Sequence, residues 1–306
     1  MWFKNARIYT LQLGDELKGK LSNEQQLEEH LMGHAFRPCK AQEMASYGFA
    51  PLYGSRSGTY SFSHQGCHYF RLLEETKLLP ASVIKTRLDE LVAEKEQEQS
   101  REVRPEERQQ LKSALINQLI AQAFAQRRDT YIWVDAKNGY CAVSAASAKR
   151  TENALAHLRE ALGGSFPAKN FSPRCVVEER MTSWVTDDKN LPQVFELGND
   201  LTLKSSDDKG GTVKISKQDL TSEEIVVHIH AGKVATDMQL TYEDACSLVL
   251  GADLSLKRIV ILDQYIERNL ERTQDEIADL QAIMILQSDL LTSLSQTISR
   301  VFDCEA

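Results

Sequence analysis

The segment from residue 80 to residue 125 restricts the fold of this chain most, because its apolar residues form two separate helical stripes. The stripes consist of Val83, Ile84, Leu88, Leu91 and Val92, and then of Leu111, Leu115, Leu119 and Ile120. Residues at these spacings line one face of a helix. The polar run KEQEQSREVRPEER separates the stripes and contains Pro105, which suits the first turn of a helix. We therefore expect a projecting helical hairpin with a packed base and a solvated tip.

The segments on either side of this hairpin mix strand and helix signals. Before it, strands are expected at 8–13, 60–62 and 69–73, and a helix at 23–32. After it, YIWVDAKNGYCAV predicts a β-hairpin with a type I′ turn at Asn138 and Gly139. Ser147 stands at the N-cap of a further helix, which the glycines at 163 and 164 end. Residues 1–79 and 126–182 are thus expected to form one α+β body.

Residues 183–306 predict a second body. Its strand candidates are FELGNDLTLKS, GTVKIS, KVATDMQLTY, CSLVL and LKRIVIL, and they surround a helix at 222–231. Apolar residues at near-heptad spacing between Ile266 and Val301 predict one long terminal helix. The expected fold class is therefore α+β, with two mixed α/β bodies, a projecting helical hairpin at 80–125 and a long C-terminal helix.

The acidic balance of the chain argues against a uniformly basic nucleic-acid-binding domain. The 306 residues carry a net charge of -8 and have a pI near 5.5, whereas such a domain usually has a pI above about 9. DNA binding would need a local basic surface on an acidic body. The cysteines have no paired spacing, no apolar run approaches about 18 residues, and the N-terminus lacks a signal-peptide pattern. We expect a cytoplasmic protein with reduced thiols and no membrane span.

The block KISKQDLTSEEIVVHIHAGK at 214–233 carries the clearest local signals. Thr221 and Glu224 match the capping box that begins a helix, and Gly232 stands where a left-handed residue ends one. Lys217 and Gln218 precede the helix start, where backbone amides and the helix dipole favour phosphate. A solvated surface cap explains the same residues, because first-turn glutamates already complement the dipole.

Other basic residues are candidates for phosphate contacts. They are Lys149, Arg150, Lys214, Lys233, Lys257 and Arg258. Lys149 and Arg150 fall in the first turn of a predicted helix, where positive charge opposes the dipole, so local helix stability does not explain them. Taken singly, a lysine is more often a solvated surface charge. Gathered on one face, these residues would form a surface that follows phosphates.

Signals for catalysis or metal binding are weak. The pairs His30 with His34 and His228 with His230, and the cluster of His64, Cys67 and His68, each lack a complete ligand set. The acids Asp207, Asp208, Asp219, Glu223 and Glu224 could supply a magnesium nuclease, but their spacing does not require one. The sequence has no phosphate-binding loop and no nucleophile elbow. We expect no metal, no cofactor and no enzymatic activity.

A series of short motifs runs along nearly the whole chain. They are WFKN at 2–5, FRPC at 36–39, GFAP at 48–51, LLPASVIK at 78–85, WVDAKNG at 133–139, ASAKR at 146–150, KQDLTSEEI with HIHAGKV at 217–234, and SLKR at 255–258. Each motif is weak alone. In their order and spacing they resemble the recombination-associated protein RdgC family, a bacterial DNA-binding family.

This resemblance implies a head-to-head homodimer that closes as a ring, with a positively charged hole wide enough for duplex DNA. It implies DNA contacts for Lys217 and Gln218. It also implies that Phe124 inserts into a pocket on the partner subunit, whereas helical periodicity alone favours a core phenylalanine at the hairpin base. Gln122 departs from the family, which often has a basic residue there. A pair of arginines at 127 and 128 follows and is a candidate replacement.

The function that the resemblance implies is sequence-independent DNA binding in the nucleoid, which limits access of the RecA recombinase to DNA. The expected partners are double-stranded DNA and a second copy of the chain, and single-stranded DNA stays open as a further ligand. Two other classes remain open. One is a protein-interaction scaffold that uses the acidic C-terminal helix and the hairpin, with incidental DNA binding. The other is a metal-dependent nuclease.

Overall fold

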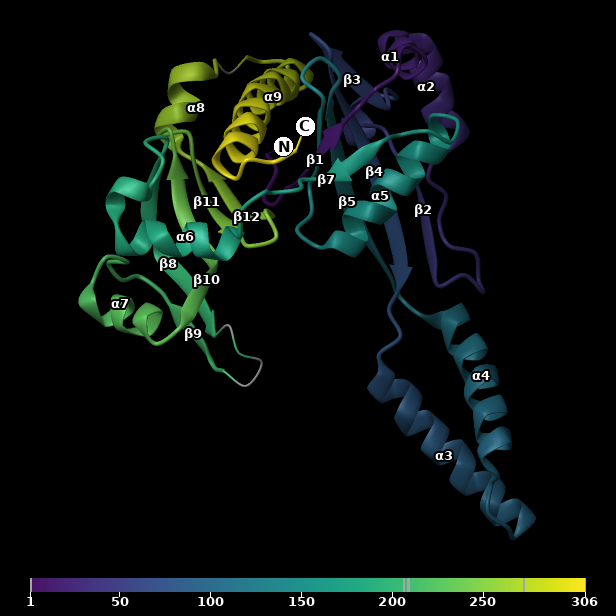
Figure 1. Cartoon of the computed structure of the whole chain (residues 1–306). Helices are drawn as coiled ribbons and strands as arrows, with labels where there is room; N and C mark the ends of the chain where they lie inside the picture. The colour runs from purple at the N-terminus through teal and green to yellow at the C-terminus, as the bar shows by residue number, and fades with distance from the viewer. Residues whose placement is uncertain (1, 206, 208–209, 272, 306) are drawn as a thin grey trace. The chain divides into compact units, whose positions relative to one another are not determined.

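The computed structural model describes residues 2–205, 207, 210–271 and 273–305, and shows two β-sheets, a helical hairpin and a long C-terminal helix (Figure 1). This confirms the predicted α+β class. The chain divides into two compact units. The hairpin unit comprises His34–Ala50 and Leu72–Asp129, and the larger unit comprises Met1–Gly33, Pro51–Arg71 and Thr130–Ala306.

The first sheet has seven strands among the described residues, in the order β2-β4-β5-β6-β1-β7, with β3 paired to β4. They are β1 (Arg7–Leu11), β2 (Ala45–Phe49), β3 (Ser61–His64), β4 (Cys67–Lys77), β5 (Ala125–Asp135), β6 (Tyr140–Val143) and β7 (Ala168–Asn170). Its helices are α1 (Asp15–Ser22), α2 (Glu24–Gly33) and α5 (Ala148–Ala161). The helix predicted at 23–32 corresponds to α2. The sequence did not predict α1, whose two buried leucines, Leu17 and Leu21, are too few to show a period.

The turn between β5 and β6 is not the predicted type I′ turn. Residues 136–139 connect the strands, and of these Gly139 alone has a positive φ, of 74°, whereas type I′ geometry requires a positive φ at Asn138 as well. The carboxylate of Asp135 explains the difference, because it accepts the amides of Lys137 and Asn138 at 3.1 and 2.9 Å. These bonds hold Asn138 in ordinary backbone geometry.

The second sheet is antiparallel, in the order β12-β11-β10-β8-β9. Its strands are β8 (Phe195–Ser205), β9 (Thr212–Ile215), β10 (Lys233–Tyr242), β11 (Cys246–Gly251) and β12 (Leu256–Ile261), and α6 (Val177–Thr186) and α7 (Glu223–His230) accompany them. These confirm all five predicted strands. On β8, Leu201 and Leu203 are buried. Thr202 and Lys204 therefore point to the opposite face, which we name the outer face.

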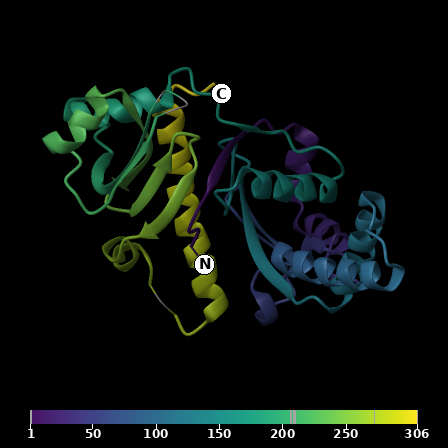
Figure 2. The same ribbon diagram turned by 90° about the horizontal axis from the view of Figure 1, so that it is seen from below.

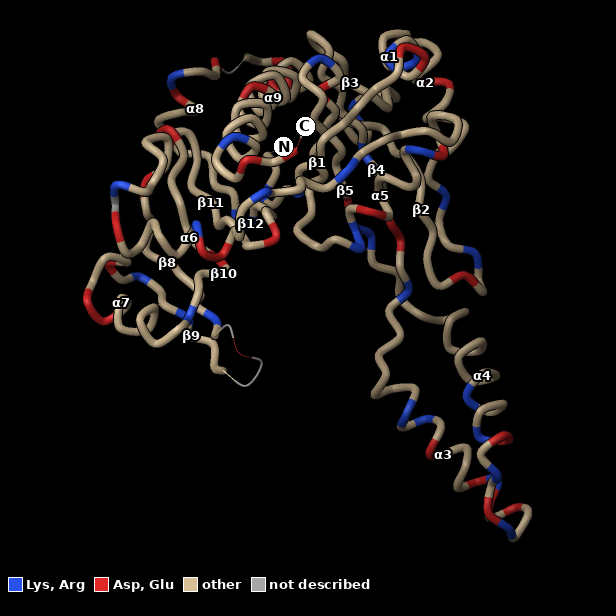
Figure 3. The backbone as a smooth tube through the Cα atoms, in the orientation of Figure 1, with Lys and Arg blue, Asp and Glu red and all other residues tan. Residues whose placement is uncertain are grey.

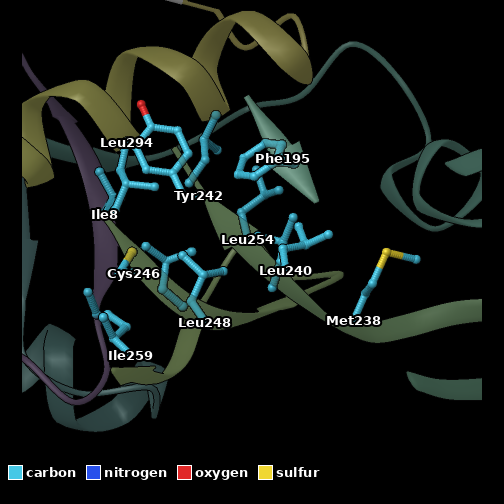
Figure 4. Close-up of a cluster of buried hydrophobic side chains, with 14 of the residues drawn as sticks. Ile8, Phe195, Met238, Leu240, Tyr242, Cys246, Leu248, Leu254, Ile259 and Leu294 are labelled. Atoms are coloured by element: carbon cyan, nitrogen blue, oxygen red, sulfur yellow. The ribbon is translucent and has the colours of Figure 1, made fainter. Parts of the chain in front are cut away.

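The buried face of the second sheet supplies much of the hydrophobic core. Met238, Leu240 and Tyr242 alternate along β10 and are each at most 1% exposed. Figure 4 shows Tyr242 beside Leu294 of the C-terminal helix, with Ile8 of β1 nearby, and Leu240 and Met238 further along the same strand. Within the larger unit, strands of both sheets thus share one apolar core.

The C-terminal segment forms two helices, α8 (Asp263–Asn269) and α9 (Glu276–Val301), instead of the single predicted helix. Asp275 explains the break. Its carboxylate accepts the amides of Ile277 and Ala278 at 2.8 and 3.3 Å, and so begins a new helix. The near-heptad pattern continued through residues 266–275 because apolar spacing does not detect an N-cap.

α9 packs on both sheets of the larger unit. Trp133 of β5 donates from Nε1 to Ser288 Oγ at 3.1 Å, and the hydroxyl of Tyr242 in β10 lies 2.6 Å from Ser293 Oγ. Figure 2 shows α9 running beside β1 and the second sheet. By length and composition α9 could cross a membrane, although the sequence predicted no span. Its packing on two sheets accounts for its apolar residues.

The N-terminal segment also joins both sheets. The amide of Ala6 donates to Leu256 O and the amide of Leu256 donates to Ala6 O, each at 2.8 Å, before the chain continues into β1. The N-terminal segment and residues 130–306 belong to the same compact unit. The expected bodies at 1–79 with 126–182 and at 183–306, and the hairpin at 80–125, stay predictions, and the compact units have different bounds.

The hairpin unit contains the two predicted helices, α3 (Ala81–Gln99) and α4 (Pro105–Gln122), with Pro105 in the first turn of α4. Leu88, Val92 and Leu115 form a small buried cluster between them. Few other residues of the hairpin are buried, as the polar run predicted.

The buried histidine of β4 gives the protein a pH-dependent stability. His68 is 4% exposed, and burial lowers its pKa to about 4. An unfolded histidine titrates near pH 6.5. Between pH 6.5 and pH 4 the unfolded chain therefore binds one more proton than the folded chain, and the free energy of unfolding decreases as the pH is lowered. From pH 7 to pH 5, this group alone should remove about 2 kcal/mol from the free energy of unfolding. Urea titrations at both pH values measure the loss, and His68→Gln should make it about 2 kcal/mol smaller. An equal loss in the variant would contradict the assignment.

Candidate functional site

The connection between β9 and α7 begins a helix by a different device from the predicted one. Ser222 is the N-cap of α7 and makes no side-chain cap. Thr221 instead donates from its amide and its hydroxyl to Asp219 Oδ1, at 2.9 and 2.7 Å. The predicted capping box of Thr221 with Glu224 is therefore wrong, because the nearby carboxylate takes both donors. Gly232, with a φ of 86°, ends the helix as predicted.

Lys217 and Gln218 lie in this connection, with exposed side chains and fixed backbones. The amide of Lys217 donates to Asp200 Oδ1 at 3.3 Å, and the amide of Gln218 donates to Asn199 O at 3.2 Å. Lys217 has a φ of 57°, and a left-handed backbone costs a residue other than glycine about 1–2 kcal/mol. The two bonds to β8 hold the lysine in this conformation and direct its side chain into solvent.

Asp200 joins Lys217 to a second predicted residue. Its other oxygen, Oδ2, lies 3.1 Å from Nη1 of Arg258, which also has a positive φ, of 50°. Beside this pair, Lys257 Nζ lies 2.6 Å from Asp237 Oδ1. Lys257 and Arg258 lie within β12, and acidic residues of the same sheet partly neutralise both.

Lys214 lies on the same outer face. It pairs with Thr202 across β9 and β8, and Thr202 pairs with Asp237 across β8 and β10. Directly paired residues share one face of a sheet. A cavity of about 240 Å³ on this face is lined by Lys214, Asp237 and Arg258 among others. Gln218 lines a second cavity, of about 410 Å³, together with Lys214 and residues of α7.

Lys204 belongs to this surface and was not predicted. It lies opposite Thr212 of β9, two residues from Lys214 along the neighbouring strand, so both lysines share the outer face. The sequence signal was present, because Lys204 follows Leu201 and Leu203 in strict alternation. At the edge of the same sheet, Lys233 Nζ donates to Gly211 O at 3.2 Å.

The charge of the surface depends on which cations have acidic partners. Lys204, Lys214, Lys217 and Lys233 form no ion pair with a described residue, whereas Lys257 and Arg258 each have one. We name the first four the free lysines, meaning that they have no acidic partner among the described residues; Lys233 still donates its hydrogen bond to Gly211 O. Figure 3 shows the basic positions along β9 and at the adjoining end of β10. First-turn glutamates already complement the dipole of α7, which leaves the start of this helix less favourable for an anion.

Lys149 and Arg150 occupy the first turn of α5, as predicted, against the first sheet. Lys149 is exposed, and Arg150 Nε donates to Thr130 Oγ1 at 2.9 Å. This bond gives Arg150 a structural role at its position against the dipole. Neither residue is among those that the outer face of the second sheet brings together.

Phe124 is 85% exposed and directly follows α4. The alternative of a core phenylalanine is therefore excluded in the single chain. Met44 and Leu78, at 44% and 50% exposed, lie in the same unit, and the amide of Leu78 donates to Phe124 O at 2.7 Å. A large apolar side chain as exposed as Phe124 is a candidate for an interaction surface. No sequence pattern singled out Met44 or Leu78.

The arginines after Phe124 have local partners. Arg127 Nε donates to Glu75 Oε2 at 2.7 Å, and its guanidinium lies 5.4 Å from the centre of the Phe36 ring. Arg128 donates to Gln126 at 3.1 Å. Arg127 is therefore held within its own unit and is a poor replacement for the basic residue that the family pattern has at position 122.

The weak chemical candidates do not converge. Among the described residues, no three His, Cys, Asp or Glu side chains group as metal ligands would. His68 is buried in β4, His228 and His230 lie on α7, and Asp219 is engaged with Thr221. Asp208 lies outside the described residues.

Comparisons with known proteins agree over the full length. A family model described as "Putative exonuclease, RdgC" matches residues 1–305. The chain is 34% identical over 307 residues to "Recombination-associated protein RdgC" of Yersinia enterocolitica serotype O:8, an alignment that covers 100% of this chain and 99% of the relative. It is similarly 34% identical to the proteins of that name in Yersinia pestis and Yersinia pseudotuberculosis, at the same coverage.

Proposed function

We propose the function of this chain from its family: it belongs to the RdgC family of recombination-associated proteins along residues 1–305. It is a DNA-binding protein without sequence preference, and two copies close as a ring around duplex DNA. The ring limits access of the RecA recombinase to the DNA that it encloses. The protein acts in the cytoplasm, on the nucleoid, and is not an enzyme.

The observation that carries this proposal is the set of free lysines on and beside the outer face of the second sheet. Lysines without acidic partners are available to phosphates, and each phosphate contact releases a counterion. In the part of the chain that the structure describes, this surface consists of the strands β8, β9 and β10 and the β9–α7 connection, and not of a helix that could enter a groove and read base edges. Contacts to the backbone would give affinity without sequence preference.

Phe124 supports the dimeric part of the proposal. A phenylalanine that is 85% exposed loses favourable burial in the single chain and would regain it in a pocket of a partner subunit. Met44 and Leu78 of the same unit are further exposed apolar side chains that a partner subunit could cover. A closed assembly would retain DNA by topology as well as by charge.

The description of the family model names a second candidate, an exonuclease. A metal-dependent nuclease needs carboxylates that converge on a cation, and the acids of the β9–α7 connection are instead used in a turn and in the first turn of α7. Incubation with plasmid and with linear duplex in Mg²⁺ decides between them. Shortened linear DNA would establish the nuclease.

Duplex affinity against salt concentration tests the proposed function. Unrelated duplexes of equal length should bind alike, and log affinity should fall linearly with log salt, at about 0.9 per neutralised phosphate. Binding that ignores salt, or a steep preference for one sequence, would overturn the proposal. No measurable duplex binding would favour the protein-interaction scaffold.

A further inference from the structure

Two charged residues are buried at the end of β4, where the hairpin unit connects its sheet to its helices. Glu75 and Lys77 are 5% and 8% exposed and, being two residues apart, lie on the same side of the strand. Burial of a charge costs several kcal/mol unless its hydrogen bonds are satisfied. Their partners therefore show what these charges hold in place.

Lys77 uses all three donors of its ammonium group on backbone carbonyls. Nζ donates to Lys40 O at 3.0 Å, to Ala41 O at 2.7 Å and to Ile120 O at 2.9 Å. Ile120 lies in the last turn of α4, where the helix dipole favours a positive charge. One side chain thus ties the end of α4 to the 40–41 loop.

Glu75 secures the strand on the other side of this junction. Its carboxylate accepts the amide of Cys39 at 2.7 Å and Nε of Arg127 at 2.7 Å. These bonds lower the pKa of Glu75, with Arg127 as the larger cause. Three segments, at 39–41, 120 and 127, are therefore attached to two neighbouring side chains of β4.

Phe124 lies between two of these attachment points. It follows Ile120 by four residues and precedes Arg127 by three, and its carbonyl accepts the amide of Leu78, the residue after Lys77. The backbone around the exposed ring therefore has its position set from β4. A phenylalanine side chain has no hydrogen-bonding group, so the direction of the Phe124 ring depends on this backbone.

We infer that Lys77, supported by Glu75, is a positioning residue that fixes the backbone from which Phe124 presents its ring to a second copy of the chain. The inference rests on the proposed dimer contact of Phe124. Lys77 acts through this backbone and does not itself contact the second copy. Without its ammonium, three carbonyls lose a donor, and the end of α4 is free to move relative to the 40–41 loop.

A double-mutant cycle on the dimer dissociation constant tests this role. Lys77→Met keeps the length of the side chain and removes its donors. In the protein with Phe124 it should weaken the dimer at least 10-fold, whereas in a Phe124→Ala background it should change the constant less than 2-fold. Lys40→Met, which alters an exposed lysine of the same loop, is the matched control and should have no effect in either background.

The outcomes separate the two claims. If Phe124→Ala alone leaves the dissociation constant unchanged, the proposed dimer contact is wrong, and this inference fails with it. If Phe124→Ala weakens the dimer but Lys77→Met acts equally in both backgrounds, Lys77 is a general stability residue and the positioning role alone is overturned. Should Lys77→Met not fold, the same cycle with Lys77→Arg, which keeps the charge and alters the geometry, decides by the same criterion.

Discussion

Phe124→Ala is expected to make the protein leave covalently closed circular DNA almost as fast as it leaves linear DNA. In the native protein, an enclosed circle cannot slide off an end, so dissociation from circles should be much slower. Truncation of an anchor residue in an interface pocket costs about 2–4 kcal/mol of association, or roughly 30- to 700-fold. The ring then opens at one contact, while the free lysines retain their affinity for the backbone.

Off-rates from a circle and from a linear fragment of the same sequence measure this effect directly. Met32→Ala is a suitable control, since Met32 is 58% exposed and lies in α2, outside the hairpin unit. It should preserve the difference between circle and fragment. Because Phe124 is 85% exposed in the single chain, its truncation should leave monomer stability nearly unchanged. A sharp loss of thermal stability with an unchanged ratio of off-rates would contradict the gate.

The sequence predicted those elements whose signals are local. The strand candidates at β8 and β10 were confirmed, and each strand buries one face, with Leu201 and Leu203 on β8 and Met238 and Leu240 on β10. Pro105 located the start of α4, since a proline loses nothing where an amide would be unpaired in any case. α1 was missed because only two of its residues reach the core.

The failures at helix ends and turns have a common physical cause. In each case an aspartate carboxylate accepts nearby donors: Asp219 from Thr221, Asp135 from Asn138, and Asp275 from Ile277. Each of these hydrogen bonds joins residues only two or three positions apart, but other donors and acceptors of similar chemistry lie equally near in the sequence. Composition alone does not rank them, and the geometry decides which donor is satisfied.

The candidate site was predictable as a list of residues and not as a surface. Sequence resemblance identified Lys217, Gln218 and Phe124. It did not show that Asp237 and Asp200 pair with Lys257 and Arg258, because those pairs cross between strands far apart in the chain. Helical periodicity alone favoured a buried Phe124 and was wrong for the single chain, since a stripe that ends at a helix terminus has the same spacing whether its last residue is buried or exposed.

Replacing Lys204, Lys214 and Lys217 together by glutamine is expected to lower duplex affinity on the order of 100-fold at 0.15 M salt. Each phosphate contact contributes about 5-fold at that salt concentration, and each contributes about 0.9 to the slope of log affinity against log salt. The slope should therefore decrease by about 2.7. All three side chains are exposed, so the free energy of unfolding should change little.

Two controls distinguish this local surface from the net charge of the molecule. Glutamine at Lys18, Lys169 and Lys189, which are exposed elsewhere, changes the net charge equally and should leave the slope nearly unchanged. Asp237→Asn should have the opposite effect on duplex affinity: it releases Lys257 from its ion pair and should tighten binding. If the remote lysines weaken binding as much as the local ones, long-range attraction suffices and the outer face has no special role. If Asp237→Asn weakens binding, Lys257 needs its acidic partner to hold it in place and does not follow phosphates directly.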